Sequence, residues 1–192
     1  LPKNLISLGD FALSDCSSLS QLNIPQGTRT IGEGAFTNCS ALETVTLPET
    51  LTSISTKAFI NCSSLSTIQI PQGISYLANS TFEGCESISQ VELPNSLTEI
   101  GDRVFAGCAI EELTIPKNVT KIGEAAFKDN ASLRYLYLPM SINRILGSAF
   151  AGCSALTDVY FPGTQEDAQS IWMEELNDFL QEATWHYSHN AH

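Results

Sequence analysis

The sequence repeats itself about every 23 residues, and this period is the feature that most restricts the fold. All eight prolines share one register, with a single interval of 22 among intervals of 23: Pro2, Pro25, Pro48, Pro71, Pro94, Pro116, Pro139 and Pro162. Self-similarity with a period of about 20–50 residues is typical of repeat arrays. We therefore predict a stack of similar coils, in which each coil contacts mainly its neighbours.

A second register holds all six cysteines: Cys16, Cys39, Cys62, Cys85, Cys108 and Cys153. Asn130 occupies the one vacant position of this register. Disulfides are the alternative that an extracellular protein would allow, but parallel side chains on stacked coils point the same way, and Asn cannot form a disulfide. Asn can hydrogen-bond the same buried backbone groups as a thiol, so we predict free, buried and inert thiols.

Each unit begins with a short strand pattern, as in Leu42-x-x-Val45-x-Leu47. Proline lacks an N–H group for a strand ladder, so Pro48 should end this strand. Residues 51–54 are predicted to form a second short extended segment. A third register is expected to fill the interior of the coils with large apolar side chains: Leu13, Phe36, Phe59, Phe82, Phe105, Phe127 and Phe150.

The repeat stops after Pro162. Thr164 is a suitable N-cap for a helix, and Ala168, Ile171, Trp172 and Leu176 lie at helical spacing on one face. The strand pattern returns at residues 183–187. We predict an α/β solenoid: residues 1–162 form a right-handed superhelix of about seven 23-residue coils with one continuous parallel β-sheet, and residues 163–192 form a C-terminal helix-plus-strand cap and a tail.

The strand half of each unit matches the leucine-rich repeat pattern, but the cysteine precedes the strand instead of following it. That order, with the L-P and I-G pairs and the A-F-x-x-C segment, resembles the BspA-like leucine-rich repeat family over residues 1–162. The Y-F-P-G-T and A-T-W-H-Y segments resemble the C-terminal part of such proteins. Members are mostly bacterial cell-surface or secreted proteins associated with adhesion and protein binding, so the resemblance implies an extracellular or cell-surface, adhesin-like binding module.

The composition restricts the partners. A net charge of −12 argues against nucleic acid as a partner, and no apolar run is long enough to predict a membrane span. The first residues match the middle of a repeat, so we expect further sequence upstream. Leu5, Leu8 and Leu13 would then lie on an uncapped N-terminal coil, which predicts fraying or weak end-to-end association.

The sequence offers few groups for catalysis. Its histidines, His186, His189 and His192, lie at the C-terminus, and we find no nucleophile–base arrangement, phosphate loop or paired carboxylates. The histidine spacing could hold a metal, but a loose tail is the preferred interpretation. We therefore predict a protein that is not an enzyme, with no cofactor and no metal site.

The outward positions of the strands suggest a ligand site. Small polar residues occupy them in the early coils, and Tyr135, Tyr137 and Tyr160 follow within two coils. Tyr137 and Tyr160 should be cross-strand neighbours in a column that continues to Thr184, whereas Tyr135 is followed by Asp158 and Glu182. Arg134 and Asp158 would supply a polar rim. We predict that a host or neighbouring-cell protein or glycan binds there; the alternatives are tyrosines that only shield the sheet, and a chain that is a passive spacer in a larger surface protein.

Overall fold

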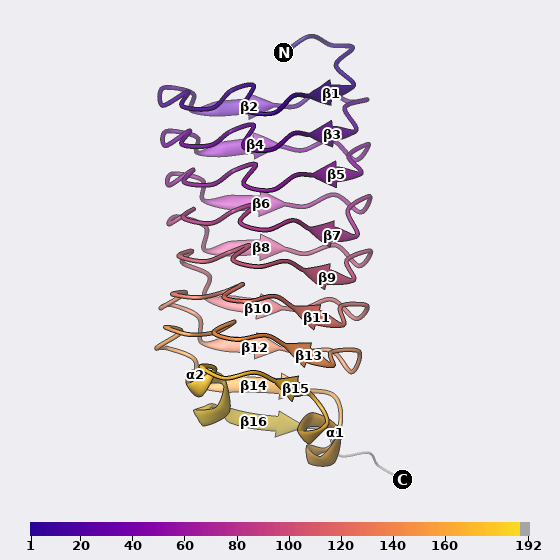
Figure 1. Ribbon diagram of the computed structural model, residues 1–192, viewed down its shortest axis with the longest axis vertical. Helices are drawn as coiled ribbons and strands as arrows, with labels where there is room; N and C mark the ends of the chain where they lie inside the picture. Colours follow the sequence, from indigo (N-terminus) through magenta and orange to yellow (C-terminus); the bar gives the residue numbers. More distant parts are fainter. Residues whose placement is uncertain (189–192) are drawn as a thin grey trace.

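The computed structural model describes residues 1–188 as an elongated stack of coils with the two ends of the chain far apart (Figure 1). Two rows of short strands run along the stack. Row A contains β2 (Gln21–Asn23), β4 (Thr44–Thr46), β6 (Thr67–Gln69), β8 (Gln90–Glu92), β10 (Glu112–Thr114), β12 (Tyr135–Tyr137), β14 (Asp158–Phe161) and β16 (Thr184–Tyr187). The stack therefore has about eight turns, one more than the predicted seven.

Row B is formed by the second extended segment of each coil. It contains β1 (Ser7–Leu8), β3 (Thr30–Ile31), β5 (Ser53–Ile54), β7 (Tyr76–Leu77), β9 (Glu99–Ile100), β11 (Lys121–Ile122), β13 (Arg144–Ile145) and β15 (Trp172–Met173). All pairings are parallel. The prediction of an α/β solenoid with a second extended segment is confirmed.

The prediction of one continuous sheet was wrong. Row A is hydrogen-bonded in three separate groups, β2–β4, β6–β8 and β10–β12–β14–β16, and row B in two, β1–β3–β5 and β7–β9–β11–β13–β15. The strands have only two to four residues, so each pairing depends on very few hydrogen bonds. A small displacement between two coils is then enough to interrupt the ladder.

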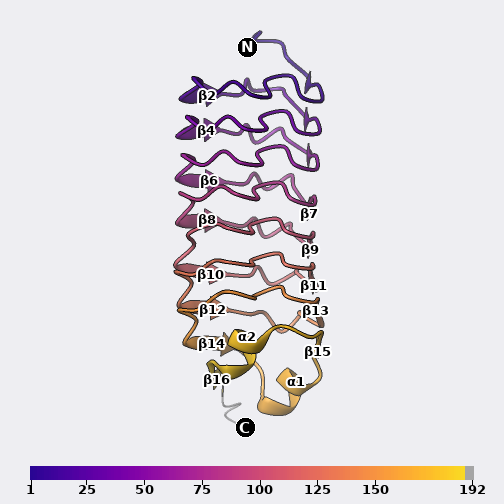
Figure 2. The ribbon, with the colours of Figure 1, turned by 60° about the vertical axis from the view of Figure 1, so that its left-hand side comes forward.

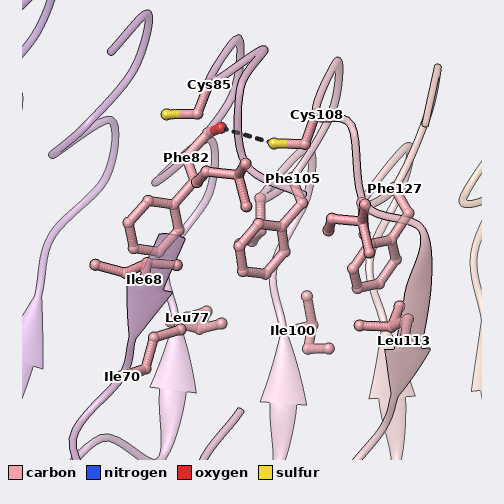
Figure 3. Packing of buried hydrophobic residues seen from close by; sticks show 14 of the residues in the cluster. Ile68, Ile70, Leu77, Phe82, Cys85, Ile100, Phe105, Cys108, Leu113 and Phe127 are labelled. Carbon is pink, nitrogen blue, oxygen red and sulfur yellow. Dashed lines mark hydrogen bonds between the residues drawn. The ribbon is translucent and has the colours of Figure 1, made fainter. Parts of the chain in front are cut away.

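The phenylalanine register lies inside the stack, as predicted (Figure 3). From Phe36 to Phe150 the rings are fully buried. Neighbouring ring centroids are 4.8–5.6 Å apart and the rings are nearly parallel. The backbone also links the coils at this position, because the Phe82 N–H group donates to the Val104 carbonyl at 2.9 Å.

The cysteines are free, and the thiols of five of them donate hydrogen bonds to backbone carbonyls of the preceding coil. Cys108, for example, contacts the Phe82 carbonyl at 3.4 Å (Figure 3). Asn130 makes the equivalent bond to the Phe105 carbonyl at 2.7 Å, which confirms the predicted role of this register. Burial raises the pKa of Cys108 and of Cys153 to about 12, so both remain neutral thiols near pH 7.

Asn130 has a further role that explains why it replaces cysteine. In other coils the third residue after the cysteine closes a turn, as when Ile88 N–H donates to the Cys85 carbonyl at 3.0 Å. The fifth coil is one residue shorter, and Ile110 is only two residues from Cys108. Its N–H group donates instead to Oδ1 of Asn130 at 3.2 Å. The shortened coil and the Asn substitution in the next coil are therefore complementary.

The cap differs from its prediction (Figure 2). Thr164 is the N-cap of α1 (Gln165–Gln169) and forms a capping box with Asp167, as the sequence suggested. However, α1 ends before Trp172, because residues 172–173 pair with β13 and extend row B. A second short helix, α2 (Asp178–Glu182), precedes β16. The predicted single helix reaching Leu176 was therefore wrong.

Candidate ligand-binding face

The tyrosines lie on the C-terminal half of row A. The strand register places Tyr137 beside Tyr160, as predicted, and Tyr160 beside His186. The second column contains Tyr135, Asp158 and Thr184. Sequence reasoning assigned Thr184 to the first column, which was wrong by two residues.

The error has a physical cause. The turn from β14 to β16 contains α1, β15 and α2 and is longer than a normal coil. The pattern Leu180-x-x-Ala183-x-Trp185 suggested a strand register, but Leu180 belongs to α2, where it is buried. Trp185 therefore pairs with Val159 instead of Phe161, and it packs against the core. His186, which lies in the predicted strand but was not among the predicted site residues, therefore joins the candidate site.

Three aromatic rings form a stack at this face. The ring centroids of Tyr137 and Tyr160 are 4.7 Å apart, those of Tyr160 and His186 are 4.6 Å apart, and both pairs are close to parallel. Tyr137 and Tyr160 are partly exposed, and His186 is exposed. Because the rings cover one another, they present their edges and polar tips to solvent. We call Tyr137, Tyr160 and His186 the aromatic stack.

Asp158 orients the end of the aromatic stack. His186 Nε2 lies 2.6 Å from Asp158 Oδ1, and the Thr157 hydroxyl donates to Oδ2 of the same carboxylate at 2.7 Å. These hydrogen bonds lower the pKa of the Asp158 carboxyl, and the one from His186 has the largest effect. In contrast, partial desolvation and the nearby carboxylate of Glu112 raise the pKa of Tyr137. At neutral pH the site therefore presents the neutral hydroxyl group of Tyr137 near the ionised carboxylate of Asp158.

Two hollows flank this face, and each is lined by a different pair of the predicted site residues. The first, of about 340 Å³, is lined by the aromatic stack and by residues at the ends of β12, β14 and β16: Leu138, Phe161, Pro162, Tyr187 and Ser188. The second, of about 680 Å³, contains Arg134 and Tyr135. Asp158 lines neither hollow, so it acts on the site through His186.

The larger hollow lies at the interruption of row A between β8 and β10, next to the shortened coil. Glu92, Glu111 and Glu112 line it together with Arg134 and Tyr135. Val91 and Leu93, whose equivalents in β10 and β12 are buried, are partly exposed there. No feature of the sequence other than the 22-residue interval could have indicated this hollow.

The described residues do not form a metal centre. Within residues 1–188, no group of three or more His, Cys, Asp or Glu side chains is placed to hold a metal ion. The predicted histidine tail includes His189 and His192, which lie outside the described residues. For the same part of the chain, the structure has no helix of the length and apolar character required to cross a membrane.

Solved structures with the same architecture include proteins from several bacteria. A leucine-rich cell-surface protein from Faecalibacterium prausnitzii is 27% identical, with a TM-score of 0.69 over 88% of this chain and 54% of that one. The leucine-rich repeat protein of T. pallidum is 24% identical, with a TM-score of 0.57 over 97% and 83% of the two chains. This chain thus spans about half the length of the F. prausnitzii protein.

The comparison with curated proteins found no match. The model of the BspA type leucine-rich repeat region, in contrast, matches six copies over residues 1–88 and 52–174. These matches cover both rows of strands except β16, all of the phenylalanine and cysteine registers and the first part of the cap. The chain therefore belongs to the BspA-type leucine-rich repeat family.

Proposed function

We propose that this chain is a non-enzymatic binding module of a bacterial cell-surface protein, and that it holds a protein or glycan against the C-terminal half of row A. The single observation that carries this proposal is the aromatic stack with its adjoining hollow of about 340 Å³. The surface location is supported by the family and by the F. prausnitzii protein, which is a cell-surface protein.

The aromatic stack has the properties of a recognition surface. Tyrosine combines a large apolar area with a polar tip and has little rotamer entropy to lose, which is why it is enriched where proteins bind partners. Stacking on neighbouring strands fixes the rings before any ligand arrives, and such preorganisation lowers the entropic cost of binding. The repeated strands place the hydroxyl groups at regular intervals, suited to a ligand with repeating hydrogen-bonding groups.

Arg134, Tyr135 and Asp158 are proposed to extend the recognition surface. Tyr135 is 39% exposed, and Arg134 is exposed beside it in the hollow of about 680 Å³. Asp158 also holds His186 against Tyr160, so it positions the end of the aromatic stack. The two hollows together would allow an extended ligand to cross β10, β12 and β14.

A passive spacer is the second candidate, and the early coils favour it. In β2 and β4 the outward residues are small or uncharged polar side chains, without aromatic groups. In the first coil Ile6 and Phe11 are also exposed, at 60% and 55%. We propose that this end forms weak end-to-end contacts, a property that would suit a chain that serves to build length.

An array of matrix proteins and glycans probed with the purified chain tests the proposal. For any ligand found, Tyr137→Ala and Tyr160→Ala should each weaken binding by about ten-fold or more, as for an interface hot spot. Thr46→Ala and Gln69→Ala are matched controls, because they occupy the same column of row A in earlier coils. Equal affinity of the tyrosine variants and the wild-type chain, with unchanged circular dichroism, would contradict the proposed site and favour the spacer interpretation.

A further inference from the structure

Row B carries an exposed tryptophan, Trp172, which the function proposed above does not use. The first residues of its strands form an outward column: Ser7, Thr30, Ser53, Tyr76, Glu99, Lys121, Arg144 and Trp172. The column changes from small hydroxyl side chains to large side chains towards the cap. It ends at Trp172, which is 56% exposed, a large value for the most apolar side chain of the column.

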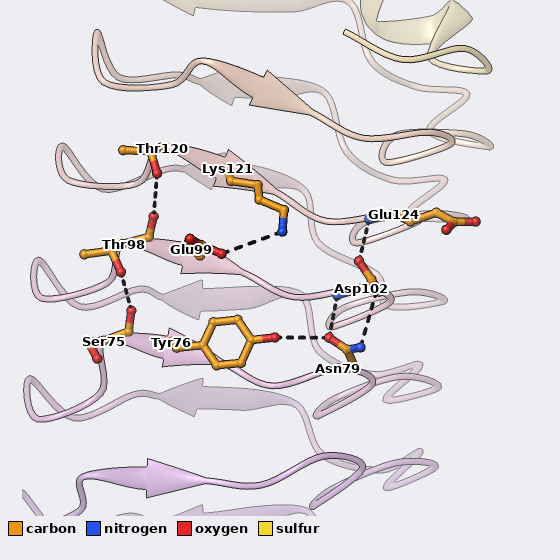
Figure 4. Close-up of polar contacts among 9 residues, drawn as sticks. All are labelled: Ser75, Tyr76, Asn79, Thr98, Glu99, Asp102, Thr120, Lys121 and Glu124. Carbon is orange, nitrogen blue, oxygen red and sulfur yellow. Dashed lines mark hydrogen bonds and ion pairs between the residues drawn. The ribbon is translucent and has the colours of Figure 1, made fainter. Parts of the chain in front are cut away.

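Most large side chains of row B are engaged with their neighbours (Figure 4). Lys121 Nζ lies 3.7 Å from Glu99 Oε2, and the Tyr76 hydroxyl donates to Asn79 Oδ1 at 3.2 Å. Trp172 has a different environment, because the Arg144 guanidinium lies over its ring, 4.4 Å from the ring centroid. This cation–π contact orients the indole and leaves more than half of the residue exposed.

A hollow of about 560 Å³ lies beside Trp172. We call it the cap hollow. Its apolar side chains are Trp172, Met173 and Leu176, and Leu176 is 63% exposed. Its charged side chains are Glu124, Glu174 and Glu175, and Arg144 is not among the residues that line it.

The wall of the cap hollow is held in place. Glu174 Oε2 accepts a hydrogen bond from Gly147 N–H at 2.9 Å, and the Glu175 carbonyl accepts one from Ser148 N–H at 3.1 Å. Buried Asn177 anchors the same segment, because its side-chain amide donates to the Glu174 carbonyl at 3.0 Å. The exposed apolar groups therefore belong to a fixed surface, and Glu124 and Glu175 remain available at its edge.

The charges around the cap hollow indicate which kind of partner can bind there. Residues 145–192 contain no Lys or Arg, and the hollow itself presents only carboxylates. A second copy of the chain carries the same net charge of −12, so electrostatic repulsion opposes self-association here. We propose that the cap hollow docks a Lys- or Arg-rich segment of another protein. The alkyl stem of a basic side chain would lie against Trp172 and Leu176, with its charged end beside Glu124 or Glu175.

The test uses the whole chain and a labelled peptide of alternating lysine and alanine, with fluorescence anisotropy as the readout. Trp172→Ser should weaken binding by about ten-fold, as expected for a central aromatic contact. The double variant Glu124→Gln, Glu175→Gln should weaken it by about three-fold and reduce its salt dependence, since two screened attractions are lost. Ser53 occupies the position equivalent to Trp172, so serine is compatible with the coil.

Two controls separate this surface from the general acidity of the chain. Glu49→Gln removes an exposed carboxylate from an early coil, and Tyr76→Ser removes an exposed ring from the same column of row B; neither should change peptide affinity. A peptide with glutamate in place of lysine should not bind. Unchanged affinity of Trp172→Ser, equal effects of Glu49→Gln and the double variant Glu124→Gln, Glu175→Gln, or equal binding of the glutamate peptide would each overturn the proposal.

Discussion

The N-terminal and C-terminal coils share one core but have different surfaces. Phe36 and Phe150, at opposite ends of the aromatic column, are equally buried and each stacks on a neighbouring ring. On the outside, row A changes from Gln, Asn and Thr in β2 and β4 to Tyr in β12, and row B changes from Ser and Thr to Arg and Trp. The repeat therefore constrains inward positions everywhere, while outward positions are free to diverge. Both candidate binding surfaces lie near the cap.

The prediction with the largest expected effect tests whether the two halves of the core contribute equally to stability. Phe59→Ala and Phe127→Ala should each reduce the free energy of unfolding by about 3–5 kcal/mol, the usual result of replacing a buried phenylalanine. Both rings are fully buried between two stacked neighbours. Denaturant unfolding of the two variants measures this directly. A loss below about 1 kcal/mol in one of them would show that the two halves are not equivalent.

A second prediction concerns the one place where the core repeat is broken. Asn130→Cys restores the cysteine register but leaves the buried Ile110 N–H without its acceptor. The free energy of unfolding should fall by about 1–3 kcal/mol, the cost of an unsatisfied buried donor.

The matched control inserts one serine after Ala109, which restores the 23-residue interval and lets the turn close on the Cys108 carbonyl. In that background Asn130→Cys should be tolerated. Equal losses in both backgrounds, measured by the same denaturant titration, would contradict the complementarity of the short coil and Asn130.

The third prediction compares the two ends. The first coil has no cap among the described residues, and its Leu5 and Leu13 are only partly buried, whereas α2 covers the last coils with buried Leu180. Fraying chain ends open with free energies near zero, whereas core strands open only with much larger ones. Amides of β1 and β2 should therefore exchange with solvent at least about ten-fold faster than those of β14 and β16. Strong protection of residues 1–12 in a strictly monomeric sample would contradict this expectation.

The smallest effect concerns two aspartates at opposite ends of the stack, Asp15 and Asp158. Hydrogen bonds lower the pKa of Asp15, mainly the one from Asn38, and that of Asp158, mainly the one from His186. A lowered folded-state pKa contributes stability at pH values above about 4, and this contribution disappears as the pH falls through the folded pKa. Carboxyl NMR titration should place both midpoints below the usual aspartate value. Asn38→Ala should raise only the Asp15 midpoint; equal shifts of both would contradict the local cause.

Some of the candidate site could be predicted from the sequence, and some could not. Tyr137 and Tyr160 were recognised as neighbours because both lie in coils of regular length. His186 was missed because the cap inserts two helices and a strand of row B into the last turn. Trp172 was assigned to a helix face, because its spacing from Ala168 is helical, although pairing with Arg144 places it in a strand. The hollow at the shortened coil had no sequence signal apart from one missing residue.

The sequence was sufficient for the fold, since a repeated pattern of apolar residues leaves each coil one way to bury its side chains against identical neighbours. The phenylalanine and cysteine registers could therefore be placed in the interior from the sequence alone. Only the tertiary structure showed where the repeat is interrupted: the breaks in row A, the acceptor that Asn130 offers to Ile110, and the register of β16. At these points the pairing depends on few hydrogen bonds between segments distant in sequence, and a local pattern contains no information about which pairing is more stable.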